Sequence, residues 1–389
     1  MTHPLAPLLP PLTRFLLEQV CWPAEKLGTV PFSGFSEKAD SPPLFPADQL
    51  AAEAARQGVA GLLHQWAQRN AGTPVADQLA ASLAPQLHAN AIHALKLLND
   101  TVRVVDLLKQ AGIESLVLKG PLLSKRYYGD WGTRNAGDVD ILVAEENVVR
   151  ADQALRDNAY RRHKPERELS RRRLDLYLDT QHEFGYRPPS GSGLVELHWR
   201  FADCPALSPQ RFADMWAGSE LQPTASHPLR TLGPADTFIQ LATHGAMDGW
   251  SALKWIADLP RVHAALCAAD LAAMQCEAAS DQTCRMLQLA LALAGGGPAR
   301  PWMDTAFGHA RNRMTSLAEP ASIGAKLRAY SGSYRYLHSL AESPAARRAM
   351  SYANLIMPAD FDRLPLPDAL TPALPWLAQC GRGIRKLLG

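Results

Sequence analysis

The residues with the clearest potential for chemistry are two aspartates in the run Gly137-Asp138-Val139-Asp140-Ile141. Successive side chains of a strand point to opposite faces, so Asp138 and Asp140 would lie side by side on one face. Two adjacent carboxylates repel each other unless a cation lies between them, and Mg²⁺ is a hard ion that prefers oxygen ligands. The alternative is a strand end with two solvated aspartates. For an isolated Asp-x-Asp pair this alternative is the more common one.

Nearby residues favour a phosphate site beside this pair. Lys119-Gly120-Pro121 follows a predicted strand and opens a helix. Backbone N–H groups, the helix dipole and the lysine ammonium could therefore converge on a phosphate, although a lysine at a strand end is also commonly solvated. Arg134 lies four residues before Asp138, and its guanidinium could complete the anion site.

A third carboxylate, Glu196, lies in the otherwise apolar run Leu194-Val-Glu-Leu-His-Trp199. Burying it is costly without a cationic partner. Three carboxylates on one small sheet, beside a phosphate-binding turn, describe a site for metal-assisted phosphoryl or nucleotidyl transfer. We expect His198 to face the opposite side of this strand, in a core or supporting role. His182 could approach from the partner strand, but the chain has no zinc-ligand spacing such as His-Glu-x-x-His.

Short apolar segments should position these residues. Strands are predicted at 113–118 and 138–143, and a hairpin of two further strands at 179–186 and 194–200. Residues 122–128 and 145–158 are predicted helices, the first ending at Gly129. The Arg- and Lys-rich run 160–173 is typical of a solvated face, with a grip on an acidic acceptor or nucleic acid as the alternative.

Helical patterns surround this unit. They cover 12–20, 47–70 and 84–111 before it, and 236–258, 264–278, 282–294 and 320–341 after it. Gly112 should cap the third of these helices, and strand patterns fade beyond Ala202. The chain therefore divides into an N-terminal helical region (1–110), an α/β core (111–201) and a C-terminal helical region (202–389).

Composition sets wider bounds on the protein. The 389 residues carry 40 basic and 38 acidic side chains and are 47% hydrophobic, which excludes wholesale disorder and gives no electrostatic argument for a DNA-coating protein. The six cysteines form no Cys-x-x-Cys pair, so we expect reduced thiols and a cytoplasmic location. Prolines interrupt the N-terminal segment and no long apolar run occurs, so neither a signal peptide nor a membrane span is expected.

Taken together, several motifs resemble the uncharacterised nucleotidyltransferase family of the DNA polymerase β superfamily. They are Leu118-Lys-Gly-Pro121, Tyr128-Gly129, Arg134, Gly137-Asp-Val-Asp-Ile-Leu-Val143 and Val195-Glu-Leu-His-Trp199. The resemblance is strongest over residues 113–200 and extends to the helical segments 242–246 and 253–258. It implies an α+β fold, in which a small mixed β-sheet nucleotidyltransferase core is flanked by N-terminal and C-terminal helical regions.

The resemblance also implies roles for individual residues. Asp138, Asp140 and Glu196 would be the catalytic residues and would hold two Mg²⁺ ions, or Mn²⁺ in their place. Contacts to the nucleotide phosphates would come from a second set, namely Lys119, Gly120, Arg134 and Ser124. The chain departs from the superfamily at one point, because Lys119-Gly120-Pro121 replaces its usual Gly-Ser turn. His244, Trp255 and Asp258 would belong to a helical lobe that closes over the base, with packing and capping as the alternative.

The leading hypothesis is a Mg²⁺-dependent nucleotidyltransferase that moves a nucleoside monophosphate from ATP or another nucleoside triphosphate to an acceptor hydroxyl. One alternative is glycosyl transfer from a nucleotide sugar at the same metal–diphosphate site. Another is a catalytically inactive module that binds a nucleotide or a partner. The sequence does not identify the acceptor, which could be a small molecule, a sugar, a peptide or protein, or RNA.

Overall fold

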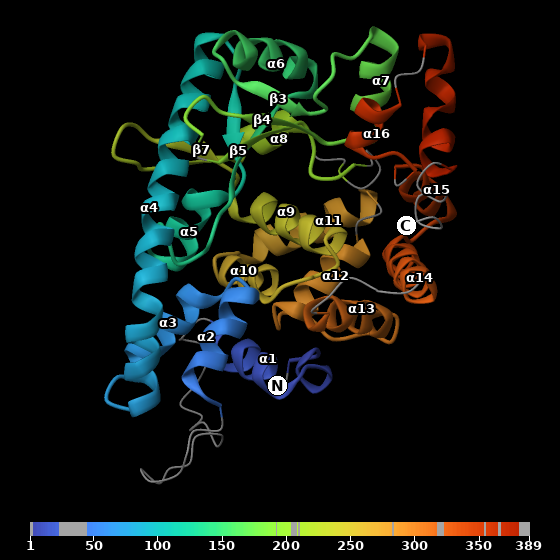
Figure 1. The fold of residues 1–389 in the computed structure, drawn as a ribbon. Helices are drawn as coiled ribbons and strands as arrows, with labels where there is room; N and C mark the ends of the chain where they lie inside the picture. The colour runs from blue at the N-terminus through green and yellow to red at the C-terminus, as the bar shows by residue number, and fades with distance from the viewer. Residues whose placement is uncertain are drawn as a thin grey trace.

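The computed structural model is an α+β fold in which a seven-stranded sheet lies above a body of helices (Figure 1). It describes residues 3–22, 45–191, 193–203, 208, 211–281, 284–316, 323–353, 355–364 and 367–380. The predicted fold class, a small mixed sheet with helical flanks, is confirmed.

The sheet has the strand order β3-β4-β5-β2-β1-β7-β6. Strands β2 and β5 are parallel, as are β1 and β7, and the other neighbours are antiparallel, so the sheet is mixed. The strands are β1 Ser115–Val117, β2 Asp138–Val143, β3 Arg161–Lys164, β4 Glu183–Arg187, β5 Leu194–His198, β6 Glu220–Gln222 and β7 Leu229–Thr231.

Helices precede, separate and follow these strands in the sequence. The helices up to the last pair of strands are α1 Pro11–Phe15, α2 Ala47–Arg56, α3 Ala60–Arg69, α4 Pro74–Gln110, α5 Gly120–Tyr128, α6 Val148–Asp157, α7 Arg171–Thr180 and α8 Phe212–Ala217. After it come α9 Pro234–Met247, α10 Leu253–Ala264, α11 Ala268–Asp281, α12 Cys284–Leu293, α13 Met303–Thr315, α14 Ile323–Leu340, α15 Pro344–Ala353 and α16 Pro358–Arg363. Short π or 3-10 turns occur at Ala6–Leu8, Leu16–Val20, Glu145–Asn147 and Asp368–Ala373.

The long helix α4 connects the sheet to the helical body. Its 37 residues span about 55 Å at the usual rise per residue, and Figure 1 shows it running down one side of the molecule. Thr73 caps its first turn by accepting a hydrogen bond from the Ala76 N–H, and Gly112 follows its last turn with φ of 68°. Its C-terminal half packs on the sheet and its N-terminal half packs on α2 and α3.

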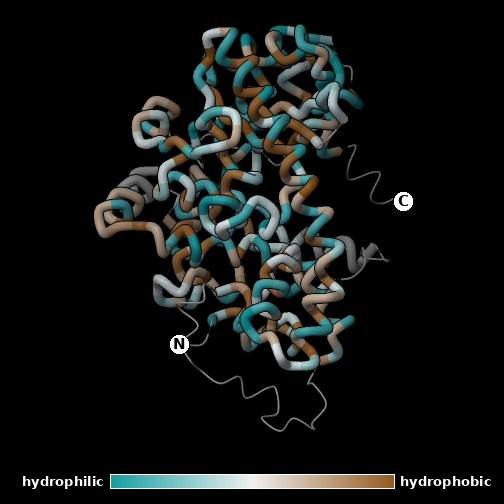
Figure 2. The backbone as a smooth tube through the Cα atoms, turned by 90° about the vertical axis from the view of Figure 1, so that its left-hand side faces the viewer, coloured by the Kyte–Doolittle hydropathy of each residue, from teal (hydrophilic) through white to brown (hydrophobic). Residues whose placement is uncertain are grey.

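Two apolar clusters cover the two faces of the sheet. On one face, Val139, Ile141 and Val195 pack against residues of α4 and α6. On the other, Leu116 and Leu142 join a larger cluster that contains residues of α1–α3 and of α9–α13. Figure 2 shows hydrophobic and hydrophilic stretches following one another along the chain, as expected where each element packs one face on a core and exposes the other.

The predicted domain boundaries remain a prediction. The helices before residue 110 and those after residue 202 share the larger of the two clusters, so they are parts of one helical body. Among the residues that the structure describes, no helix is long and apolar enough to cross a membrane.

Several predicted strand boundaries were wrong. Residues 171–180 form helix α7, so the first strand of the hairpin begins only at Glu183. Strands β6 and β7 lie beyond Ala202, where none was expected; each has three residues, too short for a sequence pattern. The basic run contributes strand β3, which pairs with β4 at the edge of the sheet.

Helix boundaries also differ from the predictions. The predicted helix 47–70 is two helices separated at residues 57–59, and 236–258 is likewise divided into α9 and α10 at residues 248–252. Gly58 and Gly249, with φ of 71° and 69°, make these two turns. Helix α4 begins ten residues before the predicted start, with Pro85 inside it. Parts of the predicted helices at 282–294 and 320–341 lie outside the described residues, as do Pro31, Pro42 and Pro43 of the predicted N-terminal loop.

Candidate active site

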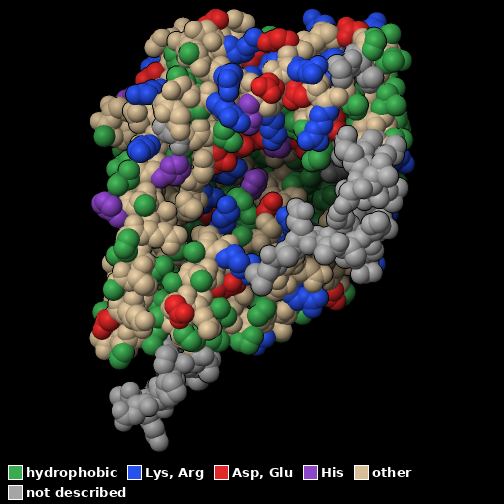
Figure 3. All heavy atoms as spheres, viewed as in Figure 1, with side chains coloured by type: hydrophobic (Ala, Val, Ile, Leu, Met, Phe, Trp, Pro, Cys, Tyr) green, Lys and Arg blue, Asp and Glu red, His purple; other side chains and the backbone are tan. Residues whose placement is uncertain are grey.

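A cavity of about 460 Å³ lies between the sheet and helices α9 and α10. Figure 3 shows the molecule hollowed near the middle of this face, with acidic, basic and histidine side chains inside the hollow. The sheet side contributes four carboxylates: Asp138, Asp140, Glu183 and Glu196. The helical side contributes His244, Met247, Asp248, Lys254 and Trp255.

The register of β2 and β5 brings the three predicted carboxylates together. Asp140 pairs directly with Glu196 in this parallel ladder, and Asp138 lies two residues before Asp140 on the same face. Val139 and Leu197 point to the opposite face, where they are buried in the smaller cluster. The sequence prediction that these strands bring the carboxylates to one face therefore agrees with the geometry.

Lys119 enters this group from the end of β1, where it precedes helix α5. Its Nζ lies 3.0 Å from Oδ1 of Asp140, and both side chains are buried. Burial by itself would lower the pKa of Lys119, but the negative charges of Asp140, Asp138 and Glu196 raise it above its ordinary value. Lys119 is therefore a fixed cation among the carboxylates, in reach of any phosphate that enters the cavity.

The two aspartates differ in electrostatic environment. The charge of Asp140, together with burial, raises the pKa of Asp138 to about 6. Burial would raise the pKa of Asp140 too, but Lys119 and His198 hold it below its ordinary value. Oδ2 of Asp140 is buried and has no hydrogen-bond partner in the described part of the chain. Asp140 is thus an ionised carboxylate with one free oxygen beside a second acid.

His198 lies on the same face as Glu196, so the expectation that it faces the opposite side was wrong. Residues two apart on a strand share a face. Its Nε2 lies 3.2 Å from Oδ1 of Asp140, 3.5 Å from Oε2 of Glu183 and 3.6 Å from Oε2 of Glu196. The histidine therefore contacts three carboxylates and belongs to the site.

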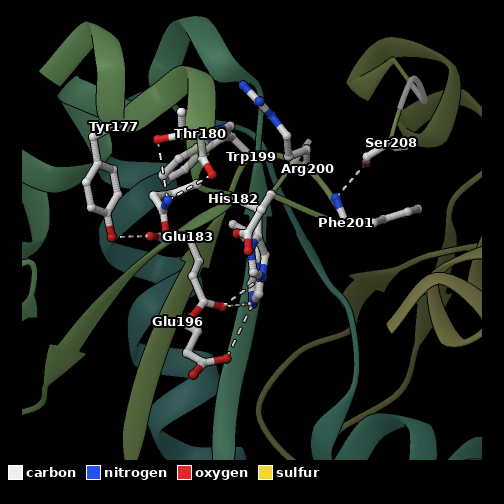
Figure 4. A network of polar contacts seen from close by, with 12 residues as sticks. Tyr177, Thr180, His182, Glu183, Glu196, Trp199, Arg200, Phe201 and Ser208 are labelled. Carbon is white, nitrogen blue, oxygen red and sulfur yellow. Dashed lines mark hydrogen bonds and ion pairs between the residues drawn. The ribbon is translucent and has the colours of Figure 1, made fainter. Parts of the chain in front are cut away.

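Sequence reasoning missed Glu183 and Asp203. Glu183 pairs with His198 across the β4–β5 ladder and also contacts Lys164 at 2.5 Å. His182 bridges the two acids, with Nε2 3.4 Å from Glu183 and Nδ1 2.5 Å from Asp203. Figure 4 shows the side chains of His182, Glu183 and Glu196 close together. Burial lowers the pKa of His182, but these two carboxylates outweigh it and raise the pKa to about 10. Glu183 could have been found from the alternation of Glu, Phe, Gly and Tyr along β4, which places it on the polar face.

Arg134 lines the cavity while its Nε is held by Asp258, at 2.9 and 3.0 Å from the two carboxylate oxygens. Tyr128 donates a further hydrogen bond of 2.5 Å to Asp258. Asp258, which the family resemblance places in a lobe over the base, thus orients Arg134 from helix α10.

Two predicted phosphate contacts do not line this cavity. Ser124 is fully buried, and its hydroxyl accepts a hydrogen bond of 3.1 Å from the backbone N–H of Arg134. It therefore positions the arginine. Gly120 is the first residue of α5 and has φ of 71°, in the left-handed region that glycine tolerates. It turns the chain from β1 into the helix that follows Lys119.

The helical side of the cavity carries an aromatic pair. The rings of His244 and Trp255 meet edge to face with centroids 4.6 Å apart, and Lys254 Nζ lies 4.1 Å above the Trp255 ring. Burial and the charge of Lys119 hold the pKa of His244 well below its ordinary value, so this imidazole is neutral. These residues would contact the part of a ligand that lies away from the carboxylates.

The donor set fits a divalent cation. Ligand atoms of Asp140, Glu196 and His198 lie within 4.8 Å of one another, as do those of His182, Glu183 and His198. The free oxygen of Asp140 and the raised pKa of Asp138 both indicate negative charge that the side chains of this site leave unneutralised. A hard ion with oxygen ligands would neutralise it.

Comparison with known proteins gives one match. A family model described as an uncharacterised nucleotidyltransferase matches residues 43–295, which is more than half of the chain and includes all seven strands. No curated protein and no solved structure matches.

Proposed function

Because this chain belongs to the uncharacterised nucleotidyltransferase family, we propose that it transfers a nucleoside monophosphate from a nucleoside triphosphate to an acceptor hydroxyl. The reaction depends on Mg²⁺, with Mn²⁺ as a substitute, and ATP is the first donor to test. In the transfer, the acceptor oxygen bonds to the α-phosphorus and the bond from that phosphorus to the bridging oxygen breaks. Pyrophosphate leaves, and the hydroxyl proton passes to solvent water.

The observation that carries this proposal is the free oxygen of Asp140. A buried carboxylate oxygen without a partner is costly unless a ligand satisfies it. It lies beside Asp138 and opposite Glu196, so we assign these three side chains as the ligands of two divalent ions, as the family resemblance implies. The ions would neutralise charge on the triphosphate and make the acceptor hydroxyl a better nucleophile.

The remaining side chains bind and position the donor. The Lys119 ammonium and the Arg134 guanidinium, which both line the cavity, bind phosphate oxygens. Asp258 holds Arg134 in place, and His198 contacts Oδ1 of Asp140, which leaves Oδ2 of that carboxylate for an ion. His244 and Trp255 lie on the far wall, where the nucleoside binds.

A cytoplasmic location is also part of this proposal. It rests on the cysteine spacing and on the free thiols of Cys21, Cys267, Cys284 and Cys380.

Calorimetry with ATP, in Mg²⁺ and in a chelator, tests the site directly. We expect binding that requires Mg²⁺ and that is lost in the double variant Asp138→Asn/Asp140→Asn, because each change removes a ligand charge. Asp157→Asn, at the exposed end of α6, is the matched control and should bind as the wild type does. Equal binding by the double variant and the wild type contradicts the metal site.

Transfer is then followed with the same protein and α-³²P-labelled nucleoside triphosphates. Label should pass to an acceptor, or slowly to water, with release of pyrophosphate. Release of labelled nucleoside diphosphate would instead indicate loss of the γ-phosphate. Glycosyl transfer is tested separately with a labelled nucleotide sugar as the donor, from which it would release a nucleoside diphosphate.

A further inference from the structure

The face of the sheet that carries the carboxylates continues outward to the edge strands β4 and β3. Glu183 and Gly185 of β4 pair with His198 and Glu196, so they lie on this face, and Arg187 follows two residues later on the same face. Arg187 in turn pairs directly with Arg161 of β3. Two arginines therefore lie opposite each other on the catalytic face.

These two arginines are unusual because no described residue neutralises them. Both side chains are exposed, and neither forms an ion pair or hydrogen bond with another residue that the structure describes. Like charges directly opposite in a sheet are destabilising. The other cations of β3 are paired: Arg162 with Asp152 on the opposite face, and Lys164 with Glu183. The unpaired charge is confined to Arg161 and Arg187.

The pair lies beside the candidate active site. The register places Arg187 level with Leu194, and Leu194 level with Asp138. Since neighbouring strands are about 4.8 Å apart, the backbones of Arg187 and Asp138 are about 10 Å apart. Leu194, between them, is 38% exposed, so the surface between the arginines and Asp138 is open. Figure 3 shows Lys and Arg side chains gathered on the rim of the hollow.

His163 links the two regions. The imidazole lies over Gly185, and the missing side chain of this glycine leaves room for it. A Cβ at position 185 would be only 3.1 Å from Nε2 of His163. That nitrogen is buried and has no hydrogen-bond partner among the described residues. Burial lowers the pKa of His163, Arg187 lowers it further, and Glu196 raises it. The imidazole therefore lies within electrostatic reach of both the arginine pair and a predicted catalytic residue.

We propose that Arg161 and Arg187 bind a phosphate group of the acceptor and thereby hold its hydroxyl at the mouth of the cavity. Guanidinium groups form paired, charge-assisted hydrogen bonds with phosphate, and two of them match its double charge. The acceptor is then a phosphate ester, either a sugar phosphate or an RNA end. The role of this phosphate ester as the acceptor rests on the proposed function. The binding of phosphate to the two arginines can be measured independently of it.

Direct binding tests the pair with two probes, ribose 5-phosphate and a 5′-phosphorylated ten-residue oligouridylate. Both are titrated into the full chain with its cavity saturated by Mg²⁺ and a non-hydrolysable ATP analogue. We expect at least one probe to bind, and the one that binds identifies the source of the phosphate. In Arg161→Gln/Arg187→Gln its affinity should fall by about tenfold or more, the loss expected from one charged hydrogen bond.

Two controls isolate the effect. Arg171→Gln/Arg172→Gln removes the same charge from exposed positions of helix α7 and should keep the affinity of the wild type. With the cavity saturated by Mg²⁺ and the ATP analogue, inorganic phosphate should raise the melting temperature of the wild type but not that of Arg161→Gln/Arg187→Gln, which should itself melt no lower than the wild type. The proposal is overturned if neither probe binds, or if both double variants bind alike. If the arginine variant loses the probe while ATP and Mg²⁺ never bind, the pair stands and the proposed function fails.

Discussion

At the level of single residues, Lys119 neutralises carboxylates, and in the proposed reaction it would also bind phosphate. Its ammonium is 3.0 Å from Asp140 and also interacts with Asp138 and Glu196. The sequence shows only a lysine at a strand end, for which a phosphate contact is a natural expectation. The structure adds that this lysine stabilises the carboxylates while no ion is bound.

Changing Lys119 to alanine should weaken the affinity for ATP more than the affinity for adenosine, because only the former has phosphates to contact. Without divalent ions the variant should also melt at a lower temperature than the wild type, since Asp140 loses its cation. Addition of Mg²⁺ should raise the melting temperature of the variant more than it raises that of the wild type. Calorimetry and thermal melts measure both effects. Lys125→Ala, in helix α5 directly after Lys119, is the control. If both affinities fall alike, Lys119 does not contact phosphate.

Removal of the charge should affect stability differently at Glu196 and at Glu183. Glu196 is partly exposed, and its one ion-pair contact among the described residues is with His198, at 3.6 Å. Glu196→Gln should therefore keep the melting temperature while transfer collapses. Glu183 is buried against Lys164 and His182, so Glu183→Gln should lower the stability by about 3–5 kcal/mol by leaving cations unpaired. Thermal melts beside a transfer assay decide. A large fall in melting temperature for Glu196→Gln would mean a structural charge instead of a metal ligand.

At the level of elements, the loop between α5 and β2 is the part of the fold that aligns the site. Its Arg134 is held by the Ser124 hydroxyl at the backbone and by Asp258 of α10 at the guanidinium. Helix α3 supports the loop from behind, where Gly61 lies against the backbone of Thr133. A small residue is required there because two backbones approach closely.

Gly61→Ala should therefore destabilise the protein. A Cβ at this position would lie 2.3 Å from the carbonyl oxygen of Thr133, so helix and loop must move apart, at a cost of about 1–3 kcal/mol. Arg134 is the next residue, so the affinity for ATP should fall as well. Denaturant unfolding and calorimetry measure the two effects.

Gly308→Ala in helix α13 is the matched control, because nothing lies within 4 Å of its added Cβ. It should leave the stability unchanged or raise it by up to about 1 kcal/mol through helix propensity. Equal stabilities of the two variants would contradict the close approach at Gly61.

For the whole molecule, the helical body joins chain segments that are far apart in sequence. His3 donates a hydrogen bond of 3.0 Å from Nε2 to the carbonyl of Leu293, and its Nδ1 accepts one of 3.2 Å from the Leu5 N–H. The contact with Leu5 requires the neutral imidazole, because a protonated Nδ1 could not accept a hydrogen bond. The beginning of the chain is thereby held to helix α12, below the sheet.

Stability should depend on pH through this histidine. Burial lowers the pKa of His3 from 6.5 to about 4, despite the backbone contact that raises it. Below pH 6.5 the unfolded chain therefore binds a proton at His3 more readily than the folded protein does. The contribution of His3 to the free energy of unfolding is complete above pH 6.5 and is lost as the pH falls toward 4. The loss is on the order of 3 kcal/mol. Denaturant unfolding at pH 7 and pH 4.5 should show a smaller drop for His3→Gln than for the wild type. An identical drop would exclude this group.

The sequence alone determined several local elements of the core and the residue types that they carry. The Asp-x-Asp run is a strand because apolar residues alternate with the aspartates, and the period of two fixes which side chains share a face. Strand β2 was predicted residue for residue, since its pattern is long enough to be unambiguous. The motif set of Lys119, Arg134, Asp138, Asp140 and Glu196 was likewise readable, because each residue type has a limited chemistry.

Only the tertiary structure decided which other residues join them. The direct pairing of Asp140 with Glu196, 56 positions apart, depends on the parallel register of two strands, and register is set by packing across the whole sheet. The same register brings Glu183 and His198 into the site, and it leaves Arg161 and Arg187 facing each other without a partner in the described part of the chain. Periodicity reports which face a residue lies on but not which residue lies opposite, because that choice is made by contacts between segments distant in sequence.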